Sequence, residues 1–302
     1  MAGTTDRGSL CCATEPIFGG FKTLGGPVFW TDQIIHGGWR IQRNVVFGKH
    51  RLLDPSERKI ASGSFDKCYH ELDRRRICGE IAPLPSHVVI VMHGLAGTRK
   101  WMAGMAEFLE EEGGYTVLNF GFASTKGTIQ QQAAALRMVL CNLKGVQEVS
   151  FVCHSMSNIM VRHLLYRFQE QGISPPVRFR RMVMISPPNH GARLAGSVGQ
   201  RAFFQCTLGE VVDQFAPCIG WPDLERQLLT PNFEFGILAG GKGDRHGYLN
   251  RIVGDDDAVI SLSTHLLRGA KDFKQVGGYH QLMPKFYRTQ CATLKFLKCG
   301  HF

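Results

Sequence analysis

The stretch that decides the fold is residues 151–158, FVCHSMSN, where an apolar run ends at a serine. The run VSFVCH (149–154) is short and apolar, which is typical of a buried strand. The following segment, SNIMVRHLLYRFQEQG (157–172), is interpreted as a helix. The stretch therefore predicts a strand, a tight polar turn and a helix in direct succession.

The same order of strand and helix recurs on both sides of this stretch. Strands are expected at HVVIVMHG (87–94), YTVLNFGF (115–122) and RMVMIS (181–186), and helices at RKWMAGMAEFLEEEGG (99–114) and TIQQQAAALRMVLCNL (128–143). Such alternation is typical of a parallel sheet with helices on both faces. The predicted fold class is α/β, a doubly wound and mostly parallel sheet in one domain over residues 85–302.

Residues 1–84 carry little of this pattern, and we expect an N-terminal extension packed on the main domain. Its first 27 residues or so are rich in Gly, Thr and Ser and are expected to be poorly ordered. A strand is predicted within WRIQRNVVF (39–47), and a turn at DPSERK (54–59).

Composition and charge exclude several classes of protein. The 302 residues are 44% apolar and 20% charged, as in a globular protein with a sizeable core. No run approaches the roughly 18 apolar residues of a membrane-spanning helix. The N-terminus lacks the pattern of a secretory signal, so the expected location is cytoplasmic. The ten cysteines form no C-x-x-C pair and no metal-ligand spacing, and we expect reduced thiols and no metal.

The net charge of +10 gathers in two short clusters, Arg74, Arg75 and Arg76, and Arg178, Arg180 and Arg181. No nucleic-acid motif accompanies them, so we expect solvated faces and no nucleic-acid partner. Peripheral contact with an anionic membrane surface is the alternative.

Functional loops of doubly wound sheets lie at the carboxyl ends of the strands. Three polar segments fall there: MHGLAGT (92–98), CHSMSN (153–158) and SPPNHGARLA (186–195). The second has the strand–Ser–helix context of a nucleophile elbow, whose usual pattern is G-x-S-x-G. Here Cys153 and Ser157 occupy the two glycine positions. Cys153 is small enough, whereas Ser157 adds a hydroxymethyl group at a tight helix start. We interpret Ser157 as the helix N-cap.

Together these segments resemble the lipase and esterase branch of the α/β-hydrolase superfamily over residues 85–302. The chain is especially similar to bacterial α/β-hydrolases with segments like HVVIVMHGL, HSMSN, MVMISPPNHGA and GDDDAV…GAKDF. The resemblance implies the α/β-hydrolase fold with a short helical cap. It also implies hydrolysis of carboxylic esters, including lipid-like esters, although thioesters and amides need the same machinery.

The family's chain order is nucleophile, acid and histidine. Ser155 is the candidate nucleophile. GDDDAVI (254–260) supplies the acid, with Asp257 the best match and Asp256 the second. His280 follows the strand expected within AKDFKQVGG (270–278). His280 would take the serine proton, and Asp257 would fix the imidazole tautomer; no cofactor is required.

The resemblance places the oxyanion donors at the backbone amides of Leu95 and Met156. His93 and Gly94 would support that loop, and His154 stands beside the nucleophile. Cys153 is rejected as a nucleophile because strand geometry would keep its side chain under the turn.

Residues 192–234 or thereabouts are expected to form the cap. QRAFFQCTLGEVVDQF (200–215) places Phe204, Leu208, Val211 and Phe215 on one helical face. We interpret this face as a hydrophobic cap that forms a wall for an acyl chain; a mobile lid and a helix packed on the body are the alternatives.

For the whole chain, the rival hypothesis is a non-catalytic α/β-hydrolase-fold protein that binds lipids or a protein partner. In that case Ser157 would distort the elbow and misplace Ser155.

Overall fold

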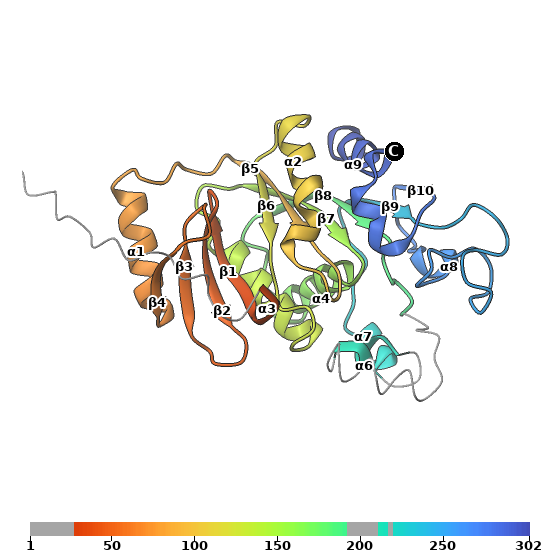
Figure 1. Cartoon of the computed structure of the whole chain (residues 1–302), viewed down its shortest axis with the longest axis horizontal. Coiled ribbons are helices and arrows are strands. Elements are labelled where there is room, and N and C mark those ends of the chain that lie inside the picture. Colours follow the sequence, from red (N-terminus) through yellow and green to blue (C-terminus); the bar gives the residue numbers. More distant parts are fainter. Residues whose placement is uncertain (1–26, 192–210, 217–219) are drawn as a thin grey trace, which may run out of the picture.

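The computed structural model describes residues 27–191, 211–216 and 220–302. Within these residues a six-stranded sheet lies at the centre of the protein, in the order β10-β9-β8-β7-β5-β6 (Figure 1). Its strands are β5 (His87–Met92), β6 (Val117–Phe120), β7 (Glu148–His154), β8 (Arg178–Ile185), β9 (Glu234–Ala239) and β10 (Asp272–Gln275). Every neighbouring pair is parallel, which confirms the predicted α/β class.

Helices cover both faces of this sheet (Figure 1). They are α2 (Ala103–Glu111), which follows the 3-10 helix η2 (Arg99–Met102), α3 (Ile129–Cys141), α4 (Met156–Glu170) and α9 (Tyr287–Cys299). Successive side chains of a strand point to opposite faces, so β5 contributes to two cores. Val88 and Ile90 pack with α3 and α4, whereas Val89 and Val91 pack with α2 and α9. The doubly wound arrangement therefore buries the strands on both sides, as the continuous apolar runs predict.

The N-terminal part forms a separate four-stranded antiparallel sheet covered by a helix. Its elements are the 3-10 helix η1 (Pro27–Phe29), β1 (Trp30–His36), β2 (Trp39–Asn44), β3 (His50–Leu53), β4 (Lys59–Gly63) and α1 (Phe65–Ile77). Only β2 and the turn before β4 were expected from the sequence. Helix α1 begins at Ser64, whose hydroxyl accepts a hydrogen bond from the amide of Lys67.

Both arginine clusters lie in local ion pairs. Arg74 and Arg75 pair with Glu71 and Glu80, Arg76 with Asp73, Arg178 and Arg180 with Glu148, and Arg181 with Glu234. These carboxylates compensate much of the positive charge that the sequence concentrates there. In the described part of the chain, no helix is both long and apolar enough to cross a membrane.

The first sheet joins the central sheet through β1 and the loop that follows β6. The amide of Asp32 donates to the carbonyl oxygen of Gly121 at 2.8 Å, and the Asp32 carboxylate accepts from the Gly121 amide at 2.7 Å. Next to this pair, Thr31 Oγ1 accepts from the amide of Ala123 at 3.0 Å. Asp32 is fully buried and also forms an ion pair with Arg40 at 2.6 Å. A buried charge thus holds the loop after β6 in place.

The expected cap lies only partly within the described residues. Residues 192–210 and 217–219, which include Phe204 and Leu208, lie outside them. The described part contains α6 (Val211–Phe215) and α7 (Trp221–Glu225). Val211 and Phe215 are buried in the same core cluster as α3 and α4. Val211 and Phe215 therefore face the body of the protein.

Replacing Asp32 with Asn should lower the free energy of unfolding by about 3–5 kcal/mol, because it leaves the buried Arg40 without a counter-charge. Urea denaturation would measure this loss. Asp223→Asn is the control, since its ion pair with Arg226 is exposed on both sides and should contribute little. Equal losses in the two variants would contradict a special role for the Asp32 site.

Candidate active site

Ser155 occupies a strained turn between β7 and α4. Its backbone has φ 55° and ψ −123°, a region that non-glycine residues rarely adopt. The Ser155 amide donates to the carbonyl oxygen of Ile185, which ties the turn to the end of β8 at 2.9 Å. Ser155 is half-buried, whereas Cys153 and His154 before it are buried. This turn leaves Ser155 partly exposed directly after a buried strand.

The two departures from the G-x-S-x-G pattern fit without distortion of the turn. Cys153 lies in β7 and is fully buried, and burial raises the pKa of its thiol well above the usual value. The prediction that Ser157 is the N-cap was wrong, because Ser155 holds that position. Ser157 lies in the first turn of α4, and its single hydroxyl proton can be donated to the carbonyl oxygen of His154 at 2.9 Å or of Met92 at 3.2 Å. Its extra atoms are therefore accommodated by backbone acceptors.

Three side chains from distant parts of the chain form a continuous hydrogen-bonded row. His280 Nε2 lies 2.7 Å from Ser155 Oγ, and His280 Nδ1 lies 2.6 Å from Asp257 Oδ2. His280 begins the 3-10 helix η3 (His280–Lys285) after β10, and Asp257 follows β9. All three groups thus come from the carboxyl ends of parallel strands, where such sheets carry their functional loops.

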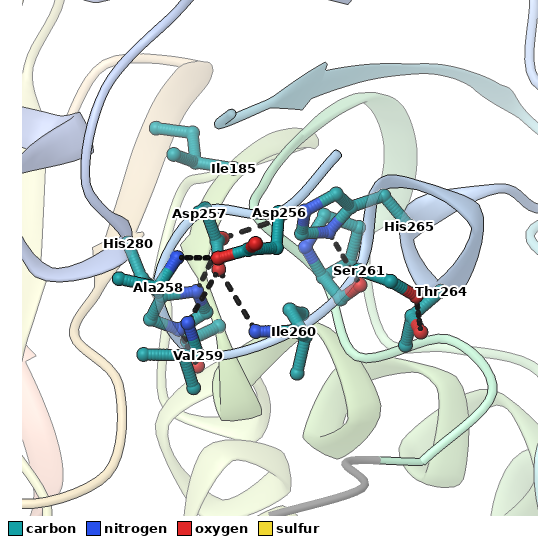
Figure 2. A network of polar contacts seen from close by, with 12 residues as sticks. Ile185, Asp256, Asp257, Ala258, Val259, Ile260, Ser261, Thr264, His265 and His280 are labelled. Carbon is teal, nitrogen blue, oxygen red and sulfur yellow. Dashed lines mark hydrogen bonds and ion pairs between the residues drawn. The ribbon is translucent and has the colours of Figure 1, made fainter. Parts of the chain in front are cut away.

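Asp257 is fully buried, and donors surround its carboxylate (Figure 2). Oδ1 accepts from the amides of Val259 at 3.1 Å and Ile260 at 2.9 Å. Burial alone would raise the pKa of Asp257. The neighbouring imidazoles of His280 and His265 outweigh burial and hold this pKa well below its usual range. The carboxylate is therefore ionised, as a partner for an imidazolium must be.

Asp256, the second candidate for the acid, points elsewhere. Its carboxylate accepts from the amides of Leu249 at 3.0 Å and Ala258 at 2.7 Å. Its hydrogen bonds shape the loop after β9. Asp257 is the residue of this pair whose side chain meets His280.

The loop after β5 presses directly against the serine turn. An added Cβ on Gly94 would lie 2.9 Å from Cβ of Ser155 and 3.2 Å from Nδ1 of His154. Only glycine permits so close an approach. Leu95 follows Gly94 in this loop and Met156 begins α4, so their backbone amides lie on the two segments that flank Ser155. The first amides of a helix have no partner within the helix and can donate to a ligand.

His93 and His154 are buried and neutral beside these segments. His93 donates from Nδ1 to the carbonyl oxygen of Gly94 at 2.9 Å, and its ring stacks on Phe122 with centroids 4.1 Å apart. His154 donates from Nε2 to the carbonyl oxygen of His280 at 2.9 Å. Burial lowers the pKa of His93 to about 4. Burial and the charge of His280 lower the pKa of His154 to about 3.

Sequence reasoning missed two residues near this site, His265 beside Asp257 and Asp32 behind the loop after β6. Neither belongs to a segment with a recognisable motif, so spacing offered no signal. Within residues 27–191, 211–216 and 220–302, no three His, Cys, Asp or Glu side chains gather as metal ligands would.

Several solved structures share this architecture. The mature Bacillus licheniformis lipase BlEst2 matches with a TM-score of 0.53 at 17% identity, over 73% of this chain and 95% of that one. A putative hydrolase from Agrobacterium vitis S4 matches with a TM-score of 0.50 at 18% identity, over 72% and 90%. A gene product of Listeria innocua has a TM-score of 0.51 at 14% identity, over 72% and 95%.

No protein-family model and no curated protein sequence matches the chain. At such low identities, the structural likeness defines the fold. The protein therefore has the α/β-hydrolase fold, as the sequence predicted. Its structural neighbours include a lipase and a hydrolase.

Gly94→Ala should lower the free energy of unfolding by about 1–3 kcal/mol, because the new methyl group meets Ser155 Cβ, which cannot move without its backbone. Urea denaturation measures the loss. Gly104→Ala in α2 is the matched control, since its Cβ would have only ordinary contact with Gln290. Alanine also favours a helix over glycine, so this variant should keep or gain stability. Unchanged stability of Gly94→Ala would contradict the close approach.

Lowering the pH from 7 to 5 should reduce the free energy of unfolding. The pKa values of His93 and His154 are below the ordinary 6.5. Between these values and 6.5 the unfolded chain binds more protons than the folded chain, so stability is lost as the pH falls. Each group contributes up to about 1.4 kcal/mol per pH unit. His154→Gln should flatten the dependence measured by urea denaturation, and exposed His246→Gln should not. Equal slopes in both variants would contradict this.

Proposed function

We propose that the protein is a serine hydrolase that cleaves carboxylic esters through an acyl-enzyme intermediate. The observation that carries the proposal is the row Asp257–His280–Ser155, with distances of 2.6 and 2.7 Å, at a strained turn. The α/β-hydrolase fold supports it, because this fold presents its nucleophile at such a turn. In this proposal, residues 85–302 are the hydrolase unit and residues 1–84 are an N-terminal extension packed on it.

The hydrogen-bond geometry supports a division of roles among the three side chains. His280 Nδ1 faces a carboxylate oxygen, which only accepts, so this nitrogen carries the proton. Nε2 is then free to accept the proton of Ser155 as Oγ attacks the carbonyl carbon of the ester. Asp257 keeps the imidazole in this tautomer and stabilises the imidazolium that forms.

Attack moves the carbonyl electron pair onto oxygen, and we assign the amides of Leu95 and Met156 as its donors. His280 then returns the proton to the leaving oxygen, the C–O bond breaks and the alcohol departs. Water attacks the acyl-enzyme with His280 as base, which releases the acid and restores Ser155. His93, Gly94 and His154 support the two segments that carry these amides. Losing one oxyanion donor typically costs about 2.7–4 kcal/mol of transition-state stabilisation.

Esters, including lipid-like esters, are the substrate class we propose. The presence of a lipase among the proteins that share this fold supports that class. Thioesters and amides could react through the same groups, and direct competition assays would rank the three.

The position of Ser157 favours this proposal over a non-catalytic binding protein. The rival requires a distorted elbow that misplaces Ser155. Instead, the Ser157 hydroxyl has the carbonyl oxygens of His154 and Met92 within hydrogen-bonding distance, and Ser155 Oγ lies 2.7 Å from His280 Nε2.

Purified protein should react covalently with a fluorophosphonate probe and hydrolyse short and medium p-nitrophenyl esters. Ser155→Ala should abolish labelling and lower kcat by about a thousandfold or more, because it removes the nucleophile. Ser157→Ala is the matched control, two residues away, and should retain labelling. Absence of labelling and turnover in the unmodified protein would leave the non-catalytic hypothesis standing.

A further inference from the structure

A second histidine lies against the Asp257 carboxylate. His265 is the last residue of α8 (Leu262–His265) and is fully buried. Its Nε2 lies 3.4 Å from Asp257 Oδ2, the same oxygen that faces His280, and this buried nitrogen makes no hydrogen bond. Figure 2 shows the two imidazoles on either side of this carboxylate.

The position of His265 is held from several directions. Its Nδ1 lies 3.1 Å from the carbonyl oxygen of Pro187, just after β8. Its own carbonyl oxygen accepts from Nδ2 of Asn189 at 2.8 Å, and Asn189 Oδ1 accepts from Arg162 of α4 at 3.1 Å. The ring is therefore fixed between β8 and the loop after β9.

These contacts determine where its protons lie. A carbonyl oxygen only accepts, so Nδ1 of His265 must carry a proton to bond to Pro187. In a neutral ring, Nε2 would then turn a lone pair toward the Asp257 carboxylate, which repels it. A second proton on Nε2 converts this repulsion into an attraction between unlike charges. Both nitrogens of His265 thus lie close to an oxygen acceptor, Nδ1 at 3.1 Å and Nε2 at 3.4 Å, and an imidazolium suits this arrangement.

We propose, on the basis of the function proposed above, that His265 is a positively charged positioning residue that shares the Asp257 carboxylate with His280. It acts through Asp257 and touches no reacting atom. By taking part of the negative charge, it weakens the attraction between Asp257 and an imidazolium at His280. The acidic limb of the activity against pH should therefore depend on His265.

The charged and titratable groups around this pair are few among the described residues that contact it. His280 and Asp257 face each other directly, and His154 lies beside His280 with ring centroids 5.2 Å apart. The Asp256 carboxylate is turned toward backbone amides. Arg162 reaches His265 only through Asn189. Asp257 thus supplies the negative charge that an imidazolium at His265 requires.

His265→Gln tests the inference, because glutamine keeps a donor but cannot hold the charge. We expect the acidic limb of kcat/KM against pH, measured with a p-nitrophenyl ester, to move up by about one pH unit. His163→Gln is the matched control. His163 is also buried, with Nδ1 3.1 Å from the carbonyl oxygen of Gln227 and with Nε2 unpartnered, but its contacts are away from Asp257. Its acidic limb should match that of the unmodified protein.

Nitrogen-15 correlation spectra of the unmodified protein at pH 7 give a second readout that does not depend on turnover or on a variant that folds. Protons on both nitrogens of His265 would support the inference. A neutral His265, or an acidic limb that does not move in a folded His265→Gln variant, would overturn it. A doubly protonated His265 in a protein that neither labels nor turns over would uphold the charged pair and refute the proposed function.

Discussion

The buried carboxylate of Asp257 organises the second half of the structure, because an ionised group without water must be matched by nearby donors. Two backbone amides, from Val259 and Ile260, satisfy one oxygen, and two imidazoles face the other. Meeting this demand shapes the turn after β9 and positions the end of α8. It also fixes His280 after β10, whose amide donates to the Asp257 carbonyl oxygen at 2.8 Å. The alignment of His280 with Ser155 follows from this network.

The central sheet and the order of its functional loops could be predicted from the sequence for a simple physical reason. Parallel strands covered on both faces must be apolar along their whole length, and β5 shows this with buried residues from Val88 to Met92. The helices between the strands are long and well delimited, as with α3, which a Thr128–Gln131 capping box begins. Polar residues after such strands therefore stand out, and Ser155, Asp257 and His280 are all of this kind.

Other features depend on contacts that no local pattern encodes. Strand β1 buries the polar residues Thr31 and Asp32, which breaks the apolar signal of a strand. The backbone partner of Asp32, Gly121, lies 89 residues away. The N-cap of α4 is Ser155 and not Ser157, because the helix begins directly after the tight turn at Ser155. The residue preferences of N-caps alone do not reveal how tight this turn is. His265 lies beside Asp257 because of the path of the irregular loop between them, and no sequence pattern indicates that path. In each case, tertiary geometry decides the role of the residue.

The N-terminal sheet is connected to the serine turn by a short series of contacts. Asp32 and Thr31 hold the amides of Gly121 and Ala123, and Phe122 between them stacks on His93. His93 leads directly into the glycine loop that packs on Ser155. An engineer who trims the chain to the strand–helix repeat would remove the acceptors that hold this loop. The segment that the strand–helix pattern identifies is therefore shorter than the part of the chain whose contacts hold the serine turn in place.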